Sequence, residues 1–251
     1  MSLNTSDLTA RGPLHDARCA AELLAHALRR GRPTDKSDYR TLLDRYGTDP
    51  AFRDLTEAVA AGLGLSVLAI TRTGLVLSPA VDSVFASKLT DMRNTPMDTE
   101  ERLVAGLALI GIAAHAYPNT VDLDDPDART VNVATIDAFI RRAAAALPPL
   151  AADSAESLVS ARRAADIYLA WDAYVPTARG GGYKRGCTYR ALDEVLGWME
   201  SQGMARPQPA LGQHTYQLTD RFRVLVADEA SNAAYEALSA IARTSDKDKV
   251  R

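Results

Sequence analysis

A basic, glycine-rich segment at residues 179–190 holds the strongest local concentration of positive charge in the chain. Two tyrosines stand among its four cations, and together these residues are Arg179, Tyr183, Lys184, Arg185, Tyr189 and Arg190. The glycines at 180–182 let the backbone approach a phosphate group closely, because they carry no side chain. The four cations therefore predict contact with the DNA backbone. A solvated charged loop and a protein-binding loop are the two alternatives.

Other patterns for phosphate and metal chemistry are incomplete. The segment 180–186 lacks the G-x-x-x-x-G-K-[ST] order of a nucleotide-binding loop, and no strand is predicted before it. The acidic stretch 122–127 lacks the glycine and the closing glutamate of a calcium loop. The two cysteines, Cys19 and Cys187, form no C-x-x-C pair, which excludes a disulfide framework and a cysteine-rich zinc site. We therefore expect no cofactor and no metal.

Catalytic patterns are not visible either. The chain has no G-x-S-x-G motif, no cysteine–histidine signature and no H-E-x-x-H spacing among its four histidines. No pair of carboxylates is distinguished from ordinary surface acids. These observations predict a protein that is not an enzyme.

The overall charge favours a protein partner over a freestanding DNA-binding domain. The net charge is −3 and the sequence pI is about 5.8, whereas phosphate-binding domains are more often basic. The N-terminal residues 1–12 are polar and show no apolar stretch of signal-peptide type. The longest apolar run, 103–114, is shorter than the roughly 20 residues that a membrane helix needs. We expect a cytoplasmic protein with no membrane contact.

A helix followed by a hairpin is predicted near the N-terminal end. Amphipathic helices are expected at 16–30 and 39–46, and Asp49-Pro50 begins another that reaches Gly62. A hairpin follows at 66–78, with its turn at 72–74. A short helix is then expected from Asp82 to Leu89.

The same order recurs near the C-terminal end. A helix with Leu192, Val195, Leu196 and Met199 on one face ends at Gly203, and a proline-rich hairpin closes on Tyr216 to Leu218. One last helix is expected from Asp220 to about residue 243. A helix followed by a β-wing is the winged-helix pattern, a variant of helix-turn-helix. The two occurrences predict a mainly α protein with short β-hairpins, built from tandem winged-helix domains.

The chain is accordingly divided into five parts. They are a disordered lead-in at 1–13, winged-helix domain 1 at 14–92, a helical connector at 93–150, winged-helix domain 2 with its C-terminal helix at 151–243, and a flexible tail at 244–251. In the connector, Asp98 to Glu101 is an acidic helix start, and the helix it begins is apolar nearly all round. We expect this helix to lie buried at the junction of the two domains or beneath a partner. A central core helix is the equal alternative.

With this arrangement the chain resembles the KITE proteins, the kleisin-interacting tandem winged-helix elements of SMC-type complexes. They include MukE- and MksE-like condensin subunits and the corresponding subunit of Wadjet-type plasmid-defence systems. The likeness rests on the tandem pattern over residues 16–243, the acidic, alanine-rich composition, and the run 196–205 followed by 216–223. It implies a non-catalytic homodimer that binds a kleisin, serves an SMC-like ATPase and touches the DNA backbone without sequence specificity, in association with the nucleoid.

The alternative function is a winged-helix transcriptional regulator that binds an operator as a dimer. Such a regulator needs a basic recognition surface repeated by symmetry. Asp54 and Glu57, on the polar side of the predicted helix 51–63, repel phosphates and disfavour it, whereas the 179–190 segment favours it. A regulator that senses an effector in a pocket formed by 81–150 is a further possibility, although no convergent polar set there indicates a ligand.

Overall fold

The computed structural model describes residues 12–29, 37–147, 155–177, 183–230 and 232–249. The chain forms two compact units, unit 1 (residues 1–87) and unit 2 (residues 88–251), each with its own fold. Both units combine helices with a small antiparallel sheet, so the expected mainly α protein with short hairpins is confirmed at that level. Most of the expected lead-in, residues 148–154 between the expected connector and domain 2, and Arg179 lie outside the described residues.

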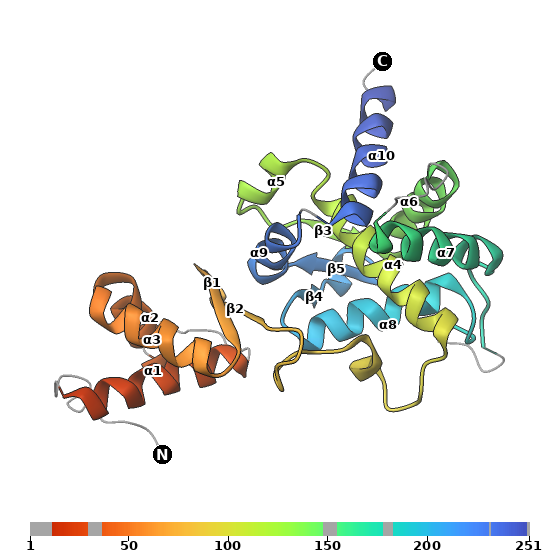
Figure 1. The fold of residues 1–251 in the computed structure, drawn as a ribbon. Helices are drawn as coiled ribbons and strands as arrows, with labels where there is room; N and C mark the ends of the chain where they lie inside the picture. Colours follow the sequence, from red (N-terminus) through yellow and green to blue (C-terminus); the bar gives the residue numbers. More distant parts are fainter. Residues whose placement is uncertain (1–11, 30–36, 148–154, 178–182, 231, 250–251) are drawn as a thin grey trace. The chain divides into compact units, whose positions relative to one another are not determined.

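Unit 1 is a set of helices followed by a hairpin (Figure 1, red to orange). In chain order its elements are α1 (Pro13–Leu28), α2 (Asp38–Thr48), α3 (Pro50–Gly62), β1 (Leu65–Thr71) and β2 (Gly74–Pro79). The helices and the hairpin predicted over this region are confirmed, with small shifts at their ends.

Local chemistry explains where the helices of unit 1 begin. The Ser37 side chain accepts a hydrogen bond from the backbone N–H of Arg40 at 3.2 Å, which caps α2. Asp49 does the same for α3 by accepting from the N–H of Phe52, and Pro50 takes the first helical position, where no N–H is needed. The buried faces of the helices and the hairpin form one core around Leu23, Leu42 and Leu75.

A tyrosine on α2 forms a hydrogen bond to the backbone of the unit 1 hairpin next to its turn. The Tyr39 hydroxyl accepts a hydrogen bond from the backbone N–H of Leu75 at 2.8 Å, and Tyr39 is 2 % exposed. Gly74 has a φ of 114°, and a Cβ at this position would lie 2.2 Å from the Tyr39 hydroxyl oxygen. The hairpin therefore requires glycine at position 74 for its backbone angle and for space.

We expect Gly74→Ala to destabilise unit 1 by about 2–3 kcal/mol, because it combines an unfavourable φ with a steric clash. Hydrogen-exchange mass spectrometry of peptides from residues 38–80 measures the change in the full chain. Gly47→Ala is the matched control, since Gly47 is helical and its Cβ would meet nothing within 4 Å. Equal exchange in the two variants would show that the Tyr39 contact does not hold the hairpin.

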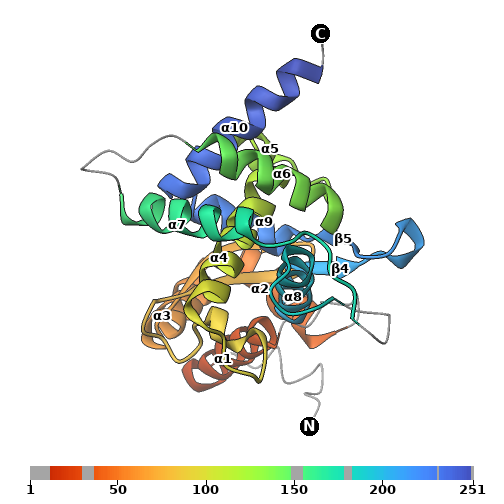
Figure 2. The ribbon, with the colours of Figure 1, turned by 90° about the vertical axis from the view of Figure 1, so that its right-hand side faces the viewer.

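Unit 2 is larger, and its helices surround a three-stranded sheet (Figure 1, yellow to blue). Its elements are the short 3₁₀ helix η2 (Leu89–Met92), α4 (Thr99–Ala116), α5 (Thr120–Asp124), β3 (Thr130–Asn132), α6 (Val133–Ala146), α7 (Glu156–Ala170), α8 (Thr188–Ser201), β4 (Ala205–Pro207), the 3₁₀ helix η3 (Pro209–Leu211), β5 (Thr215–Leu218), α9 (Asp220–Asp228) and α10 (Ala233–Lys249). The strand order is β3-β5-β4, with both pairs antiparallel. β4 lies beside α8 in both views (Figures 1 and 2).

The apolar helix of the expected connector is the central helix of unit 2. Asp98 caps α4 by accepting from the N–H of Glu101 at 2.8 Å, while Glu101 accepts from the N–H of Asp98 at 3.0 Å, a reciprocal capping box. α4 then packs against α6, α7, α8 and α10. Val104, Leu107 and Ile112 are at most 2 % exposed and belong to the single core of the unit. α4 is therefore a central core helix, which was the alternative to a helix at a domain junction or beneath a partner.

The five-part division of the chain differs from the two units. Residues 93–147 share one hydrophobic core with residues 155–242, so they do not form a separate connector. The division between the units falls at residues 87 and 88, a few residues before the expected boundary at 92. The physical reason is that α4 and α6 bury their apolar faces against α7, α8 and α10.

Two local predictions were wrong. The helix expected at 82–89 is replaced by turns and by η2, because Val81 and Val84 are more than 90 % exposed and no core covers them. The single last helix is divided into α9 and α10, since the Asn232 side chain accepts from the N–H groups of Ala234 and Tyr235 and starts a new helix. α10 extends to Lys249, into the segment expected as a flexible tail, because no glycine or proline interrupts it.

Candidate functional site

The predicted DNA-contacting residues lie at and just before the start of α8 in unit 2. The backbone N–H of Lys184 donates to the carbonyl of Val175 at 2.7 Å, and Tyr183 forms a β-bridge with Pro176, so this stretch is fixed to the segment after α7. Lys184 and Arg185 are exposed, and Arg190 is half-buried in the first turn of α8. Arg179, the fourth predicted residue, lies outside the described residues.

Arg185 is held by the carboxylate that caps α4. Its Nε donates to Glu101 Oε1 at 2.6 Å and its Nη2 donates to Glu101 Oε2 at 2.9 Å, a two-pronged pair that matches the planar guanidinium. Asp98 Oδ2 lies 3.8 Å from the same guanidinium. The Arg185 side chain nevertheless remains 61 % exposed, so part of it stays in contact with water.

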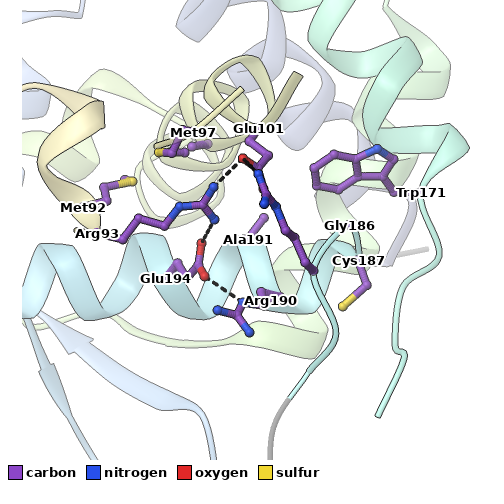
Figure 3. Close-up of a pocket in the computed structure, with 12 residues that line it drawn as sticks. Met92, Arg93, Met97, Glu101, Trp171, Gly186, Cys187, Arg190, Ala191 and Glu194 are labelled. Carbon is purple, nitrogen blue, oxygen red and sulfur yellow. Dashed lines mark hydrogen bonds and ion pairs between the residues drawn. The ribbon is translucent and has the colours of Figure 1, made fainter. Parts of the chain in front are cut away.

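Two further arginines extend this pair into a cluster (Figure 3). Arg93 donates to Glu101 and also to Glu194 Oε2, the latter at 3.3 Å. Arg190 donates from Nε to Glu194 Oε1 at 2.7 Å. We call Arg93, Glu101, Arg185, Arg190 and Glu194 the arginine–glutamate cluster. It joins the segment before α4, the start of α4, the segment before α8 and α8 itself, which are distant in sequence.

Glu101 is the most strongly perturbed acid of this cluster. Burial alone would raise its pKa, since its side chain is 8 % exposed. Hydrogen bonds from Arg185, from the backbone N–H of Asp98 and from Arg93 outweigh this effect and lower the pKa of Glu101 from 4.5 to about 2. The carboxylate is therefore ionised at all physiological pH values, which suits a structural anion better than a general acid or base.

We expect this low pKa to make unit 2 sensitive to acid. The pKa of Glu101 is lower in the folded state than in the unfolded chain, so its contribution is complete above about pH 5 and is lost as the pH falls towards 2. Its size is about 3 kcal/mol. Glu101→Gln should lower the stability at pH 7 by about that amount and flatten the acid dependence, measured by urea unfolding between about pH 2 and 7. Glu100→Gln, at an exposed neighbour, should change neither.

The hollow beside the cluster is too small for an organic substrate. It is lined by residues before and within α4, at the end of α7, and before and within α8, among them Met92, Met97, Glu101, Trp171, Cys187 and Glu194 (Figure 3). Its volume is about 20 Å³, enough for a water molecule. Ligand pockets are more than ten times larger, on the order of 300–1,000 Å³. The small hollow and the ion pairs around it therefore favour a structural role for the cluster.

A second polar network lies buried beneath the start of α8. Asp137 on α6 accepts hydrogen bonds from the Tyr168 hydroxyl at 2.8 Å and from the Thr188 hydroxyl at 2.5 Å. Arg141 donates to Asp137 Oδ2 at 3.0 Å and to the backbone carbonyl of Trp171 at 2.9 Å. The network joins α6, α7 and α8 and fixes the end of the segment that carries Lys184 and Arg185.

Sequence reasoning did not find either network. A signal for Asp137 existed, because this acid stands between Ile136 and Ile140 on the apolar side of an amphipathic helix. Glu101 was recognised only as part of an acidic helix start. Its partner Arg185 is 84 positions away, and no spacing rule connects them.

The charges near α8 are nearly balanced. Three guanidinium groups of the cluster face the carboxylates of Glu101, Glu194 and Asp98. Of the predicted cations that the structure describes, Lys184 is the one whose side chain forms no ion pair with another described residue. The remaining open face of α8 carries Asp193 and Glu200, which repel phosphates. Among the predicted cations that the structure describes, Lys184 and the exposed part of Arg185 are therefore the groups best placed to contact DNA.

The described residues carry neither a cluster of metal ligands nor a membrane-spanning helix. Within these ranges, no group of three or more histidine, cysteine, aspartate or glutamate side chains is placed to hold a metal ion. No helix in the same ranges combines the length and the apolar character needed to cross a bilayer. Comparisons with protein-family models, with curated proteins and with solved structures found no match to this chain.

Proposed function

We propose that this chain is a non-catalytic, homodimeric tandem winged-helix subunit of an SMC-type, condensin-like complex that organises DNA or defends against plasmids. In this role it binds a kleisin chain, serves an SMC-like ATPase and touches the DNA backbone without reading sequence. The observation that carries the proposal is a helix followed directly by an antiparallel hairpin in each unit, α3 with β1–β2 and α8 with β4–β5. A hairpin after the second helix of a helix-turn-helix is the winged-helix arrangement.

The junction between helix and hairpin is built alike in the two units. α3 is followed by Gly64 with φ 66°, and β1 begins at the next residue. α8 is followed by Gly203 with φ 70°, and β4 begins two residues later. A left-handed glycine ends a helix and turns the chain sharply. The two units share little sequence, so this common junction supports a repeated architecture.

The apolar helix α4 does not provide the partner surface that its sequence suggested. Its apolar side chains are covered by α6, α7, α8 and α10, so its contribution is to the core. A kleisin or a second subunit would therefore bind to other surfaces of the chain.

Backbone contact with DNA is favoured over base reading. Lys184 and part of Arg185 are exposed at the start of α8, which would be the recognition helix of unit 2. Asp193 and Glu200 on the open face of α8 oppose its entry into the major groove. Phosphate contacts made only by a few exposed cations give weak binding that depends on salt and not on sequence.

We expect Lys184→Ala to weaken binding equally for unrelated duplexes and to lower the salt slope by roughly one unit. Arg185→Ala should have a smaller effect, because Glu101 and Asp98 already engage this guanidinium. Fluorescence anisotropy at about 50 mM and 200 mM salt measures both changes. Arg163→Ala, at an exposed position on α7, is the control for the loss of one positive charge.

The same titration distinguishes the alternative function. Tight binding of the unaltered chain to one sequence would establish an operator-binding regulator and contradict the proposal. Weak, sequence-independent binding is the expected result. Co-expression with an SMC-like ATPase and a kleisin encoded by neighbouring genes should then give a stable complex. A failure to assemble would contradict the proposed binding to a kleisin.

A further inference from the structure

A tyrosine-rich, acidic surface lies on unit 2 next to the arginine–glutamate cluster. It comprises one face of α8, the described residues next to the Pro176–Tyr183 bridge, and the β4–β5 hairpin. We call it the tyrosine–acid face, and its residues are Tyr174, Tyr183, Tyr189, Asp193, Glu200, His214 and Tyr216.

The aromatic rings of this face pack in mutual edge-to-face contacts. The centroid distances are 5.5 Å for Tyr174–Tyr183, 6.0 Å for Tyr174–Tyr189 and 5.8 Å for Tyr183–Tyr189, with interplanar angles near perpendicular. Such contacts fix the rings in place. Tyr174 nevertheless remains 58 % exposed. An exposed, immobilised tyrosine of this kind is typical of binding surfaces, because little conformational entropy is lost when a partner covers it.

The acidic residues lie on the same side of α8 as one of these rings. At 100° per residue, Tyr189, Asp193, Gly197 and Glu200 fall within one narrow stripe of the helix surface. A Cβ at Gly197 would meet nothing within 4 Å, so the stripe is open at its middle. Another polypeptide could therefore approach the α8 backbone closely between the two carboxylates.

The neighbouring charges make the face acidic. Burial raises the pKa of Tyr216, and the carboxylates of Asp193 and Glu200 raise it further, which places both acids near this ring. His214 Nδ1 lies 2.8 Å from Asp193 Oδ1 and also packs on Tyr183.

Two nearby arginines, Arg190 and Arg206, do not neutralise the face. Arg190 is engaged with Glu194 and the Tyr183 carbonyl. Arg206 lies one residue from buried Ala205 on β4 and therefore points to the opposite face of the sheet. Lys184 stands at the rim, next to Tyr183 in the sequence.

We infer that the tyrosine–acid face binds an arginine-bearing segment of a partner protein. A guanidinium group stacks on tyrosine rings and donates paired hydrogen bonds to carboxylates, and this face offers both. A lysine ammonium lacks the planar stacking surface, and DNA phosphates are repelled by Asp193 and Glu200. The inference goes beyond the proposed function, because it assigns a protein ligand to the acidic face of α8 and holds whether or not the partner is a kleisin.

The test uses the full chain and two short fluorescein-labelled peptides in which serine alternates with arginine or with lysine. We expect the arginine peptide to bind several-fold more tightly than the lysine peptide, because only arginine gains the stacking contribution. The double variant Asp193→Asn/Glu200→Gln should weaken the arginine peptide by about tenfold. Tyr174→Leu should remove most of the preference for arginine. Because Tyr174 is largely exposed, this variant should stay folded, and a thermal melt checks this.

The matched control is Asp124→Asn/Asp127→Asn, which changes the net charge equally at exposed positions elsewhere in unit 2. It should leave peptide binding unchanged. The inference is overturned if the unaltered chain does not bind the arginine peptide, if it binds both peptides equally, or if both double variants weaken binding to the same extent. Duplex DNA binding, which we expect to depend on Lys184, is measured in a separate titration. A failure of the proposed DNA contact can therefore be distinguished from a failure of peptide binding at the tyrosine–acid face.

Discussion

Leu107→Asp should unfold unit 2. Leu107 is 2 % exposed at the centre of α4, and its neighbours in the core are apolar side chains of α6, α7, α8 and α10. The substitution removes a buried leucine, which costs about 2–5 kcal/mol, and leaves a carboxylate without a partner, which costs several more. The total approaches or exceeds the roughly 5–15 kcal/mol by which a domain is normally stable.

Tryptophan fluorescence can follow this change in unit 2 alone. Both tryptophans of the chain, Trp171 and Trp198, belong to unit 2, whereas unit 1 has its own core and should stay folded. We therefore expect a red-shifted emission together with partial retention of the helical circular dichroism signal. Arg102→Asp, at an exposed position near the start of α4, is the control and should be nearly neutral. A folded Leu107→Asp variant would show that α4 is not the core helix.

Elements set by local chemistry could be predicted from the sequence. The α3 start at Asp49-Pro50 and the acidic start of α4 at Asp98 follow from capping rules that involve only a few neighbouring residues. The β1–β2 hairpin was recognisable because apolar runs flank the turn that leads into Gly74. In each case the residues that decide the structure are adjacent in the chain.

Elements set by competing local signals or by distant residues could not be predicted. The break between α9 and α10 depends on Asn232, whose capping hydrogen bonds outweigh a continuous apolar pattern. The position of α4 depends on which faces of four other helices are free to cover it. The pattern of apolar residues indicates that a helix is buried, but it does not identify the helices that pack against it.

The candidate site shows the same division between local and distant information. The sequence identified Lys184, Arg185 and Arg190 as a basic group, and the structure does place these three near the start of α8. It could not show that Glu101 and Glu194 accept hydrogen bonds from two of them. A count of nearby cations therefore overstated the charge available to DNA, because ion pairs formed by folding are not visible in a linear pattern.

Asp137→Ala should be the most destabilising polar substitution in unit 2, at about 3–5 kcal/mol. Asp137 is 5 % exposed, and its removal leaves the Tyr168 hydroxyl and the Arg141 guanidinium without their main acceptor. A buried donor that loses its acceptor costs more than the hydrogen bond itself contributes. Urea unfolding followed by tryptophan fluorescence measures the loss. Asp166→Ala on α7, which breaks a solvent-exposed pair with Arg162, should cost well under about 1 kcal/mol.

A double-mutant cycle tests whether Asp137 acts through Tyr168. Tyr168→Phe alone should cost about 1 kcal/mol, since the ring stays in place and only the hydroxyl is lost. In the double variant Asp137→Ala/Tyr168→Phe the loss should be smaller than the sum of the two single losses, because no orphaned hydroxyl remains. Strict additivity would mean that the two residues act independently. Coupling would show that one carboxylate on α6 holds α7 and α8 together, and with them the segment that presents Lys184 and Arg185 to solvent.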